Sequence, residues 1–338
     1  MQSIFIRSET FQNEYRTPLV PEDVKFLLRE GIQVYIQSSQ KRIFSDKAYS
    51  DISGCILTHE SWTHPQFQKS LILGIKELTG LEDLSGHTHV YFSHTFKQQE
   101  GARRTLQAFV RSNSKLYDCE YFTDTSGNRV IAFGWYAGVV GAALGLQEYA
   151  RKTIHGESLQ NLSPWHSFDE LLRSIPDVGS PKIAVLGPYG RCGQGVCNIL
   201  EKLELEYTSF PKEALIEHLE EFDIVYNCIL LDEAYTTVWY TQSTVFDHTT
   251  VIVDISCDYS KTNNPIQLYS RPTNWAQPVY TPNDKVSIIA IENLPSLLPA
   301  ESSNHFSKRL LPLLFVYPNH CWKKAIDVFY LKAHMYEE

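Results

Sequence analysis

The sequence predicts a two-domain α/β protein whose parallel sheets are flanked by helices, with a cleft between the domains. The length of 338 residues exceeds the roughly 250–300 residues at which single cores stop growing. In both halves, short apolar runs alternate with helical patterns, which is typical of βαβ units. A glycine-rich turn near the middle, after one apolar run and before a helical pattern, indicates where the second unit begins.

Composition narrows the possible functions. The net charge is −9, whereas a nucleic-acid reader normally needs a basic face, so no nucleic-acid partner is expected. The apolar stretch 130–146 is shorter than the ~20 residues of a bilayer span and contains glycines, so we expect a buried interdomain helix and no membrane partner. The N-terminus lacks the basic and apolar regions of a secretory leader.

Seven cysteines lie far apart and form no CxxC motif, so no metal site is predicted. Reduced thiols in a cytoplasmic protein are the expectation.

The first 130 residues should form one α/β sheet. A helix is expected over 21–31, because Pro21 lies near its start and Gly31 just past its end. A second helix is expected over 102–113. Strands are expected at SIFIR, IQVYI, LILGIK and HVYFSH.

The second half shows the same alternation of expected strands and helices. A long helix over 132–153 has small residues that permit close helix packing, and a polar loop follows it. Strands are expected at KIAVLG, EYTSF, DIVYNCIL, TVIVDIS and VSIIAI, and the tail from Pro295 should be helical. We therefore expect a substrate-binding domain formed by 1–132 plus 301–338, and a dinucleotide-binding domain over 133–300.

The segment KIAVLGPYGRCGQGVCNILEKL carries the most informative local signal. Glycines are needed where a turn takes positive φ and where the backbone approaches a pyrophosphate, and the helix N-terminus then offers N–H groups to the phosphates. The strand before this loop and the helix after it favour a Rossmann-like dinucleotide site. Its glycines are Gly187, Gly190, Gly193 and Gly195.

One feature of that motif is missing. An acid usually ends the second strand and binds the adenosine ribose. Glu206 has about the right separation but begins the expected strand, and Ser209 lies near the expected position of the acid. The motif alone therefore does not choose between NAD and NADP.

Polar side chains in the first half follow the expected strands. Ligands of open α/β sheets bind beyond the carboxyl ends of the strands, so these side chains are expected to converge. A lysine in such a cleft can act as a base, and a histidine can pass protons in either direction. The members are Lys76, Glu77, His94, Lys97, Arg16, Asp118, Glu120 and Arg129.

Taken together, the motifs of the chain resemble those of the NAD-dependent, L-lysine-forming saccharopine dehydrogenases. They are IRSET, LGIKE, FSHTFKQQ, LYDCEYF, RVIAFGWYAGVVGAALG, GPYGRCGQG, VIVDIS, TNNPI and IENLPSLLP, and they cover almost the whole chain. That family is related in fold to alanine dehydrogenase and transhydrogenase. The resemblance implies reversible cleavage of saccharopine by NAD and water into lysine and 2-oxoglutarate.

The resemblance also implies roles for residues. Lys76 matches the base that takes the amine proton, His94 the residue that activates water, and Arg16 the clamp on a substrate carboxylate. Residues that match the lining of the substrate site are Glu77, Lys97, Gln99, Glu120 and Arg129. Those that match the cofactor site are Gly187, Gly190, Arg191, Cys192, Gly193, Gly195, Asp254, Asn293 and Leu294.

The chain departs from the family at Phe11, where relatives often have a lysine, and at the missing acid. Two alternatives stay open: an alanine-dehydrogenase-like or opine-type amino-acid dehydrogenase, and a catalytically silent nucleotide-binding protein. A monomer or small homo-oligomer is expected. If the strand order is that of a Rossmann fold, Cys192 and Cys228 follow neighbouring strands and are candidates for an oxidation-sensitive disulfide.

Overall fold

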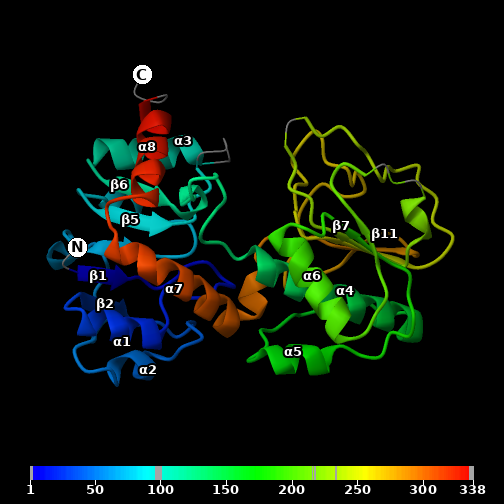
Figure 1. Ribbon diagram of the computed structural model, residues 1–338, viewed down its shortest axis with the longest axis horizontal. Coiled ribbons are helices and arrows are strands. Elements are labelled where there is room, and N and C mark those ends of the chain that lie inside the picture. Colours follow the sequence, from blue (N-terminus) through cyan, green and yellow to red (C-terminus); the bar gives the residue numbers. More distant parts are fainter. Residues whose placement is uncertain (1–2, 96–100, 215, 217, 233, 335–338) are drawn as a thin grey trace. The chain divides into compact units, whose positions relative to one another are not determined.

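The computed structural model describes residues 3–95, 101–214, 216, 218–232 and 234–334. The chain divides into two compact units, which are drawn with their elements labelled in Figure 1. Unit 1 comprises Met1–Ala132 and Pro299–Glu338, and unit 2 comprises Phe133–Leu298.

Unit 1 is built on a fully parallel sheet of six strands in the order β3-β2-β1-β4-β5-β6. The order runs outward in both directions from the neighbouring pair β1 and β4, so the topological switch point lies between them. The strands are β1 (Ser3–Ile6), β2 (Gln33–Gln37), β3 (Ile56–Thr58), β4 (Leu71–Leu73), β5 (Thr88–Tyr91) and β6 (Lys115–Asp118). The sequence patterns predicted β1, β2, β4 and β5, but not β3 and β6.

Helices cover this sheet. In Figure 1, α8 lies beside α3 and packs on β6, and α7 packs against α1. The hydroxyls of Ser303 and Ser307 on α7 accept hydrogen bonds from the main-chain N–H groups of Thr17 and Val20, which anchors the C-terminal segment to unit 1. The helices are α1 (Pro21–Arg29), α2 (Asp46–Ser50), η1 (Pro65–Phe67), η2 (Leu81–Asp83), α3 (Ala102–Arg111), η3 (Cys119–Tyr121), α7 (Pro299–Phe315) and α8 (Cys321–His334).

Unit 2 contains a second six-stranded sheet, in the order β11-β12-β10-β9-β7-β8. All pairs are parallel except β11 with β12, where β11 forms an antiparallel edge. The strands are β7 (Ile183–Leu186), β8 (Thr208–Phe210), β9 (Ile224–Asn227), β10 (Thr250–Asp254), β11 (Tyr280–Asn283) and β12 (Val286–Ile289). The α/β class with parallel-dominated sheets is therefore confirmed, and β11 was not predicted.

Two helices of unit 2 cross at very short range. A Cβ on Gly138 of α4 would overlap the carbonyl oxygen of Cys192, and one on Gly195 of α6 would overlap that of Trp135. The small residues of the long helix therefore serve close packing within unit 2, on α6 and on the sheet strands β9 and β10. The helices of this unit are α4 (Gly134–His155), α5 (Phe168–Ser174), α6 (Arg191–Lys202), η4 (Leu219–Glu221) and η5 (Leu294–Leu297).

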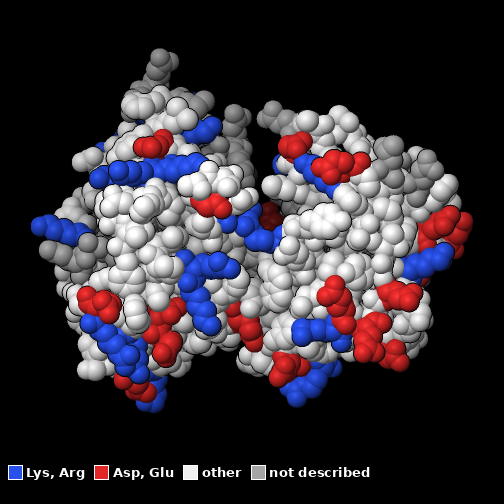
Figure 2. All heavy atoms as spheres, in the orientation of Figure 1, with Lys and Arg blue, Asp and Glu red and all other residues white. Residues whose placement is uncertain are grey.

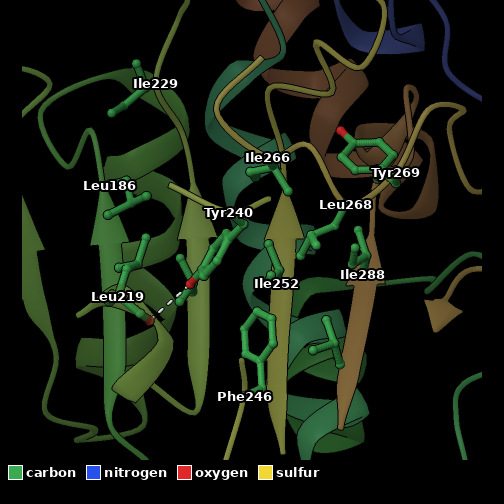
Figure 3. Packing of buried hydrophobic residues seen from close by; sticks show 14 of the residues in the cluster. Leu186, Leu219, Ile229, Tyr240, Phe246, Ile252, Ile266, Leu268, Tyr269 and Ile288 are labelled. Carbon is green, nitrogen blue, oxygen red and sulfur yellow. Dashed lines mark hydrogen bonds between the residues drawn. The ribbon is translucent and has the colours of Figure 1, made fainter. Parts of the chain in front are cut away.

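Irregular segments cover the other face of the unit 2 sheet. Between β9 and β10, and between β10 and β11, the described residues form turns and loops rather than α-helices. They bury apolar side chains against the sheet, as Figure 3 shows for Tyr240 and Phe246 near Ile252. The Tyr240 hydroxyl donates to the carbonyl oxygen of Leu219 at 3.0 Å, which ties one loop to η4.

None of the described helices is long and apolar enough to cross a membrane. On the face of each unit drawn in Figure 2, basic and acidic side chains are interspersed, and no broad basic surface is seen on that face.

Candidate functional site

Five of the polar residues predicted from the first half lie at or near the carboxyl end of the unit 1 sheet. Lys76 and Glu77 follow β4, His94 follows β5, and Glu120 follows β6, and these three strands are neighbours. Arg16 belongs to the long connection after β1, the other neighbour of β4. This is the edge at which open α/β sheets bind ligands.

Glu77 and His94 form a close hydrogen-bonded pair. The Nδ1 of His94 lies 2.5 Å from the Oε1 of Glu77, and both side chains remain partly exposed to solvent. Burial raises the pKa of Glu77, but the His94 hydrogen bond and the positive charge of Lys76 outweigh it, and the net shift is downward. His94 adopts φ +52°, which is uncommon for a non-glycine residue and is found preferentially at functional sites.

Arg16 is held by a carboxylate of its own segment. Its Nε lies 2.7 Å from Glu14 Oε1 and its Nη2 2.5 Å from Glu14 Oε2, and both side chains are buried. Burial raises the pKa of Glu14, but the charge and hydrogen bonds of Arg16 and the charge of Lys76 lower it overall. The Nε–Nη2 edge of Arg16 is thus engaged by Glu14.

Asp118 links the ends of β5 and β6. Its Oδ2 accepts from the Ser93 hydroxyl at 2.7 Å, and its Oδ1 accepts from the Glu120 main-chain N–H at 2.9 Å. Burial raises the pKa of Asp118 to about 6, against the lowering effect of these hydrogen bonds. The Oε1 of Glu120 lies 3.5 Å from the Nη1 of Arg129, so these two predicted lining residues form an ion pair.

Phe11 lies over the predicted base. The Nζ of Lys76 is 5.0 Å from the centre of the Phe11 ring, within the range of a cation–π contact. The aromatic ring of Phe11 therefore contacts the side chain of the predicted base. Lys97 and Gln99 lie outside the described residues.

The glycine loop of unit 2 joins β7 to α6. Gly187 takes φ +75°, and a Cβ on Gly193 would overlap the Gly187 carbonyl, so these two glycines make the tight turn. Gly195 provides the contact with α4 described above. Gly190 is the N-cap of α6, and a Cβ there would meet only the Gly187 carbonyl, at 3.6 Å, so the start of α6 stays open. Arg191 follows as an exposed residue.

The end of β8 carries no acid among its own residues. Ser209 lies in the middle of the strand, and Pro211 and Lys212 follow Phe210. The Nζ of Lys212 lies 2.5 Å from Asp232 Oδ2, so the cation at this end is paired.

Three of the residues matched to the cofactor site are buried inside unit 2. Leu294 is almost fully buried, and Asn293 accepts a hydrogen bond from the Trp275 indole. Asp254 accepts from Asn227 Nδ2, the Cys257 N–H and the Tyr269 hydroxyl. Burial raises the pKa of Asp254 to about 6, although these donors lower it.

Tyr269 also lines a pocket of about 600 Å³, together with polar residues that include Gln267, Arg271 and Asn274. The Asp254 hydrogen bond thus fixes a wall of that pocket. The contact of Asp254 with the cofactor stays a prediction.

The structure has no disulfide among its described residues, which include all seven cysteines. Burial raises the pKa of the Cys228 thiol, and the charges of Cys192 and Cys197 add to this effect. A disulfide between them remains a prediction. Within the described residues, no group of three or more His, Cys, Asp or Glu side chains is placed to hold a metal ion.

Two α/β units, one with a glycine loop before a helix and one with a Lys–Glu–His cluster at a switch point, define a dehydrogenase of the alanine dehydrogenase and transhydrogenase class. Family models describe residues 5–140 as the alanine dehydrogenase/PNT N-terminal domain and residues 182–330 as the C-terminal domain. Among solved structures, L-alanine dehydrogenase has a TM-score of 0.70 at 16% identity, covering 97% of this chain and 93% of that one. Transhydrogenase from Sinorhizobium meliloti has a TM-score of 0.70 at 14% identity, covering 97% of both chains. These likenesses show the fold.

Sequence comparison is more specific. Saccharopine dehydrogenase [NAD(+), L-lysine-forming] of Emericella nidulans is 33% identical, over 98% of this chain and 97% of that protein. The protein of the same name from Candida glabrata is 32% identical, over 97% of this chain and 96% of that protein. The chain belongs to the L-lysine-forming saccharopine dehydrogenase family, and it is an oxidoreductase.

Proposed function

We propose that this protein cleaves saccharopine with NAD and water, reversibly, to L-lysine and 2-oxoglutarate. The observation that carries the proposal is the cluster of Lys76, Glu77 and His94 at the carboxyl end of β4 and β5, in a chain of this family. Unit 1 is the substrate-binding domain in this proposal, and unit 2 is the dinucleotide-binding domain.

The residues of unit 2 fit a dinucleotide. Gly187 and Gly193 shape the turn, Gly190 leaves the N-terminus of α6 open, and Arg191 and Cys192 begin the helix that follows. Helix N-termini offer N–H groups and a positive dipole end to a pyrophosphate. Asp254, Asn293 and Leu294, all buried, are proposed to complete the cofactor site. When bound, the cofactor supplies a hydride acceptor.

The names of the relatives support NAD over NADP, because both saccharopine dehydrogenases compared above are named for NAD(+).

Lys76 and His94 act at successive steps in this proposal. Lys76 takes the proton of the secondary amine while hydride leaves the neighbouring carbon, and an imine results. His94 takes a proton from water as the water oxygen bonds to the imine carbon, and the imine nitrogen takes back the proton held by Lys76, which gives a carbinolamine. His94 then gives its proton to the lysine nitrogen as the carbon–nitrogen bond breaks. The carbinolamine hydroxyl loses its proton to Lys76, and 2-oxoglutarate remains.

The charged residues around these two groups suit the substrate. Saccharopine carries three carboxylates and an ammonium group, and arginine binds carboxylates bidentately. Arg129 and Arg16 are the described candidates for carboxylates, and Glu120 is the candidate for the ammonium group. Lys97 and Gln99 complete the proposed lining.

Initial rates test the proposal. NAD reduction at 340 nm is measured with saccharopine and with alanine, and the reverse reaction with lysine plus 2-oxoglutarate. We expect NADH formation with saccharopine, little with alanine, and a preference for NAD over NADP. Turnover of alanine but not saccharopine would favour an alanine-dehydrogenase-like enzyme, and cofactor binding without any turnover would favour a silent protein.

A further inference from the structure

A buried ion pair in the segment after β1 forms hydrogen bonds with the main chain of Lys76. Glu9 Oε2 accepts the Lys76 N–H at 3.0 Å, and Glu9 Oε1 accepts the Ile75 N–H at 2.7 Å. Arg7 Nη2 donates to the Lys76 carbonyl oxygen, and Arg7 Nη1 lies 3.3 Å from Glu9 Oε2. Both main-chain polar groups of Lys76 are therefore bound by one pair of side chains.

The Arg7–Glu9 pair is buried, and the neighbouring backbone leaves space for it. The exposed fractions of the Arg7 and Glu9 side chains are 2% and 5%. A Cβ on Gly74 would overlap the Arg7 guanidinium, so the glycine before Ile75 provides the space that the guanidinium fills. The main-chain N–H of Arg7 also bonds to the Leu73 carbonyl at 3.1 Å, which extends the contact between β1 and β4 by one residue.

We infer that Arg7 and Glu9 are positioning residues for Lys76, and that they fix the direction in which its side chain leaves the sheet. The inference rests on the proposed role of Lys76 as the base. The orientation of the Cα–Cβ bond follows from the φ and ψ of Lys76, and the two main-chain hydrogen bonds restrain both angles. A displacement of about 1 Å at a reacting group costs on the order of 10²-fold in rate.

Stability alone does not account for such a pair. Two charges taken out of water lose hydration, and buried ion pairs often contribute no more than well-packed apolar residues. Burial raises the pKa of Glu9 despite the charge of Arg7, which means that the surroundings disfavour the charged carboxylate. The Arg7–Glu9 pair lies at the switch point of the sheet and binds the main chain of Lys76. This position, together with the unfavourable burial of its charges, is consistent with a role in the reaction.

The chain offers a matched control. Arg42 and Asp46 also lie in unit 1, and their Nη1–Oδ1 distance is 3.3 Å. Arg42 bonds to the Gln37 carbonyl and Asp46 to Ser38 and Ser39, so this pair holds a different loop. Asp46→Asn therefore removes the same kind of charge without touching Lys76.

The experiment is a double-mutant cycle with saccharopine and NAD. Glu9→Gln keeps one amide oxygen for two main-chain N–H groups, and we expect kcat to fall about 10–10²-fold. The KM for saccharopine and the Kd for NAD should stay within about twofold, and Asp46→Asn should leave kcat within about twofold. In the Lys76→Met background, Glu9→Gln should cause no further loss, because its effect passes through Lys76.

Two outcomes overturn the inference. The first is a wild-type kcat for Glu9→Gln. The second is an equal fractional loss of kcat in the wild-type and Lys76→Met backgrounds, because a merely structural role would lower both alike. If Glu9→Gln does not fold, Arg7→Lys is judged by the same cycle, because lysine keeps the charge but lacks the fork that reaches both Glu9 and the Lys76 carbonyl. Full activity of Lys76→Met would instead refute the proposed base, which separates the two failures.

Discussion

His94 Nδ1 and Glu77 Oε1 lie 2.5 Å apart, although 17 positions separate the residues in the sequence. They meet because β4 and β5 are neighbouring parallel strands whose carboxyl ends carry them. A carboxylate on Nδ1 fixes the tautomer and the orientation of an imidazole, and it leaves Nε2 to exchange protons.

Glu77→Gln should therefore impair the hydrolytic step. The amide no longer stabilises a protonated ring, so kcat should fall by about 10²-fold, at the low end of the range for acid–base groups. The KM for saccharopine should change less than kcat. Steady-state rates measure both values, and a kcat equal to that of the wild type would show that the Glu77–His94 contact is not used in the reaction.

Lys76→Met and His94→Gln test the two proton-transfer roles. Each variant should lose about 10²–10⁴-fold in the oxidative rate, while NAD affinity, measured by fluorescence titration, stays near the wild-type value. The double variant should lose much less than the product of the two losses if the residues act as a coupled pair. Near-normal turnover by both single variants would disprove these assignments even within the same family.

Gly138→Ala tests the contact between α4 and α6. The new Cβ would overlap the carbonyl of Cys192 in the first turn of α6, and overpacking of this kind costs about 1–3 kcal/mol. We expect a lower Tm and weaker NAD binding. Gly134→Ala in the same helix is the control, because its Cβ would meet side-chain atoms of Cys192 and Arg191 at 3.3–3.4 Å, and these can shift. An equal loss in both variants would contradict the close-contact explanation.

His89 should make unit 1 sensitive to acid. Its ring is fully buried among Trp62, Phe109 and Tyr91, and neither nitrogen has a hydrogen-bond partner in the structure. Burial, with smaller effects from the charges of Arg7 and His87, lowers its pKa well below 6.5.

The unfolded chain binds a proton below about pH 6.5 and the folded chain does not, so the stability present above that pH is lost as the pH falls, at about 1.4 kcal/mol per pH unit. His89→Phe should reduce this slope, and the remainder comes in part from His87, whose pKa burial also lowers. The exposed control His59→Gln should leave the slope unchanged. Urea unfolding at pH 7.5, 6.0 and 5.0 measures the slopes. A His89→Phe slope equal to that of the wild type would rule out this source of acid sensitivity.

Local patterns predicted the buried strands well and the edges poorly. Ile183–Leu186 is a fully buried apolar run, and Thr250–Asp254 is fully buried around three apolar residues, so both stand out in the sequence. In contrast, β3 has three residues that are all at least partly exposed, and β11 is exposed and contains Pro282. Proline and exposure argue against a strand, yet an antiparallel edge tolerates both.

For the candidate site, the sequence predicted the residues at strand ends but not the contacts between distant segments. Sequence position placed Lys76, Glu77 and His94 at strand ends, because their strands have clear patterns. The roles of Arg7 and Glu9 were missed although both lie in the IRSET motif. Their contact with Lys76 exists only because β1 and β4 are neighbours, and that pairing spans nearly 70 positions of chain. Gly74, placed within an apolar strand pattern, was the one local signal that a side chain from elsewhere needed space.

Product stoichiometry tests the central claim most directly. The protein is incubated with saccharopine and NAD, with Lys76→Met as the matched control, and the amino acids and oxo acids are quantified by mass spectrometry alongside NADH. We predict equal amounts of lysine, 2-oxoglutarate and NADH, at a rate lowered about 10²–10⁴-fold in the variant. NADH accompanied by glutamate and an aldehyde would mean that the other carbon–nitrogen bond is cleaved, and the account of this site would be wrong.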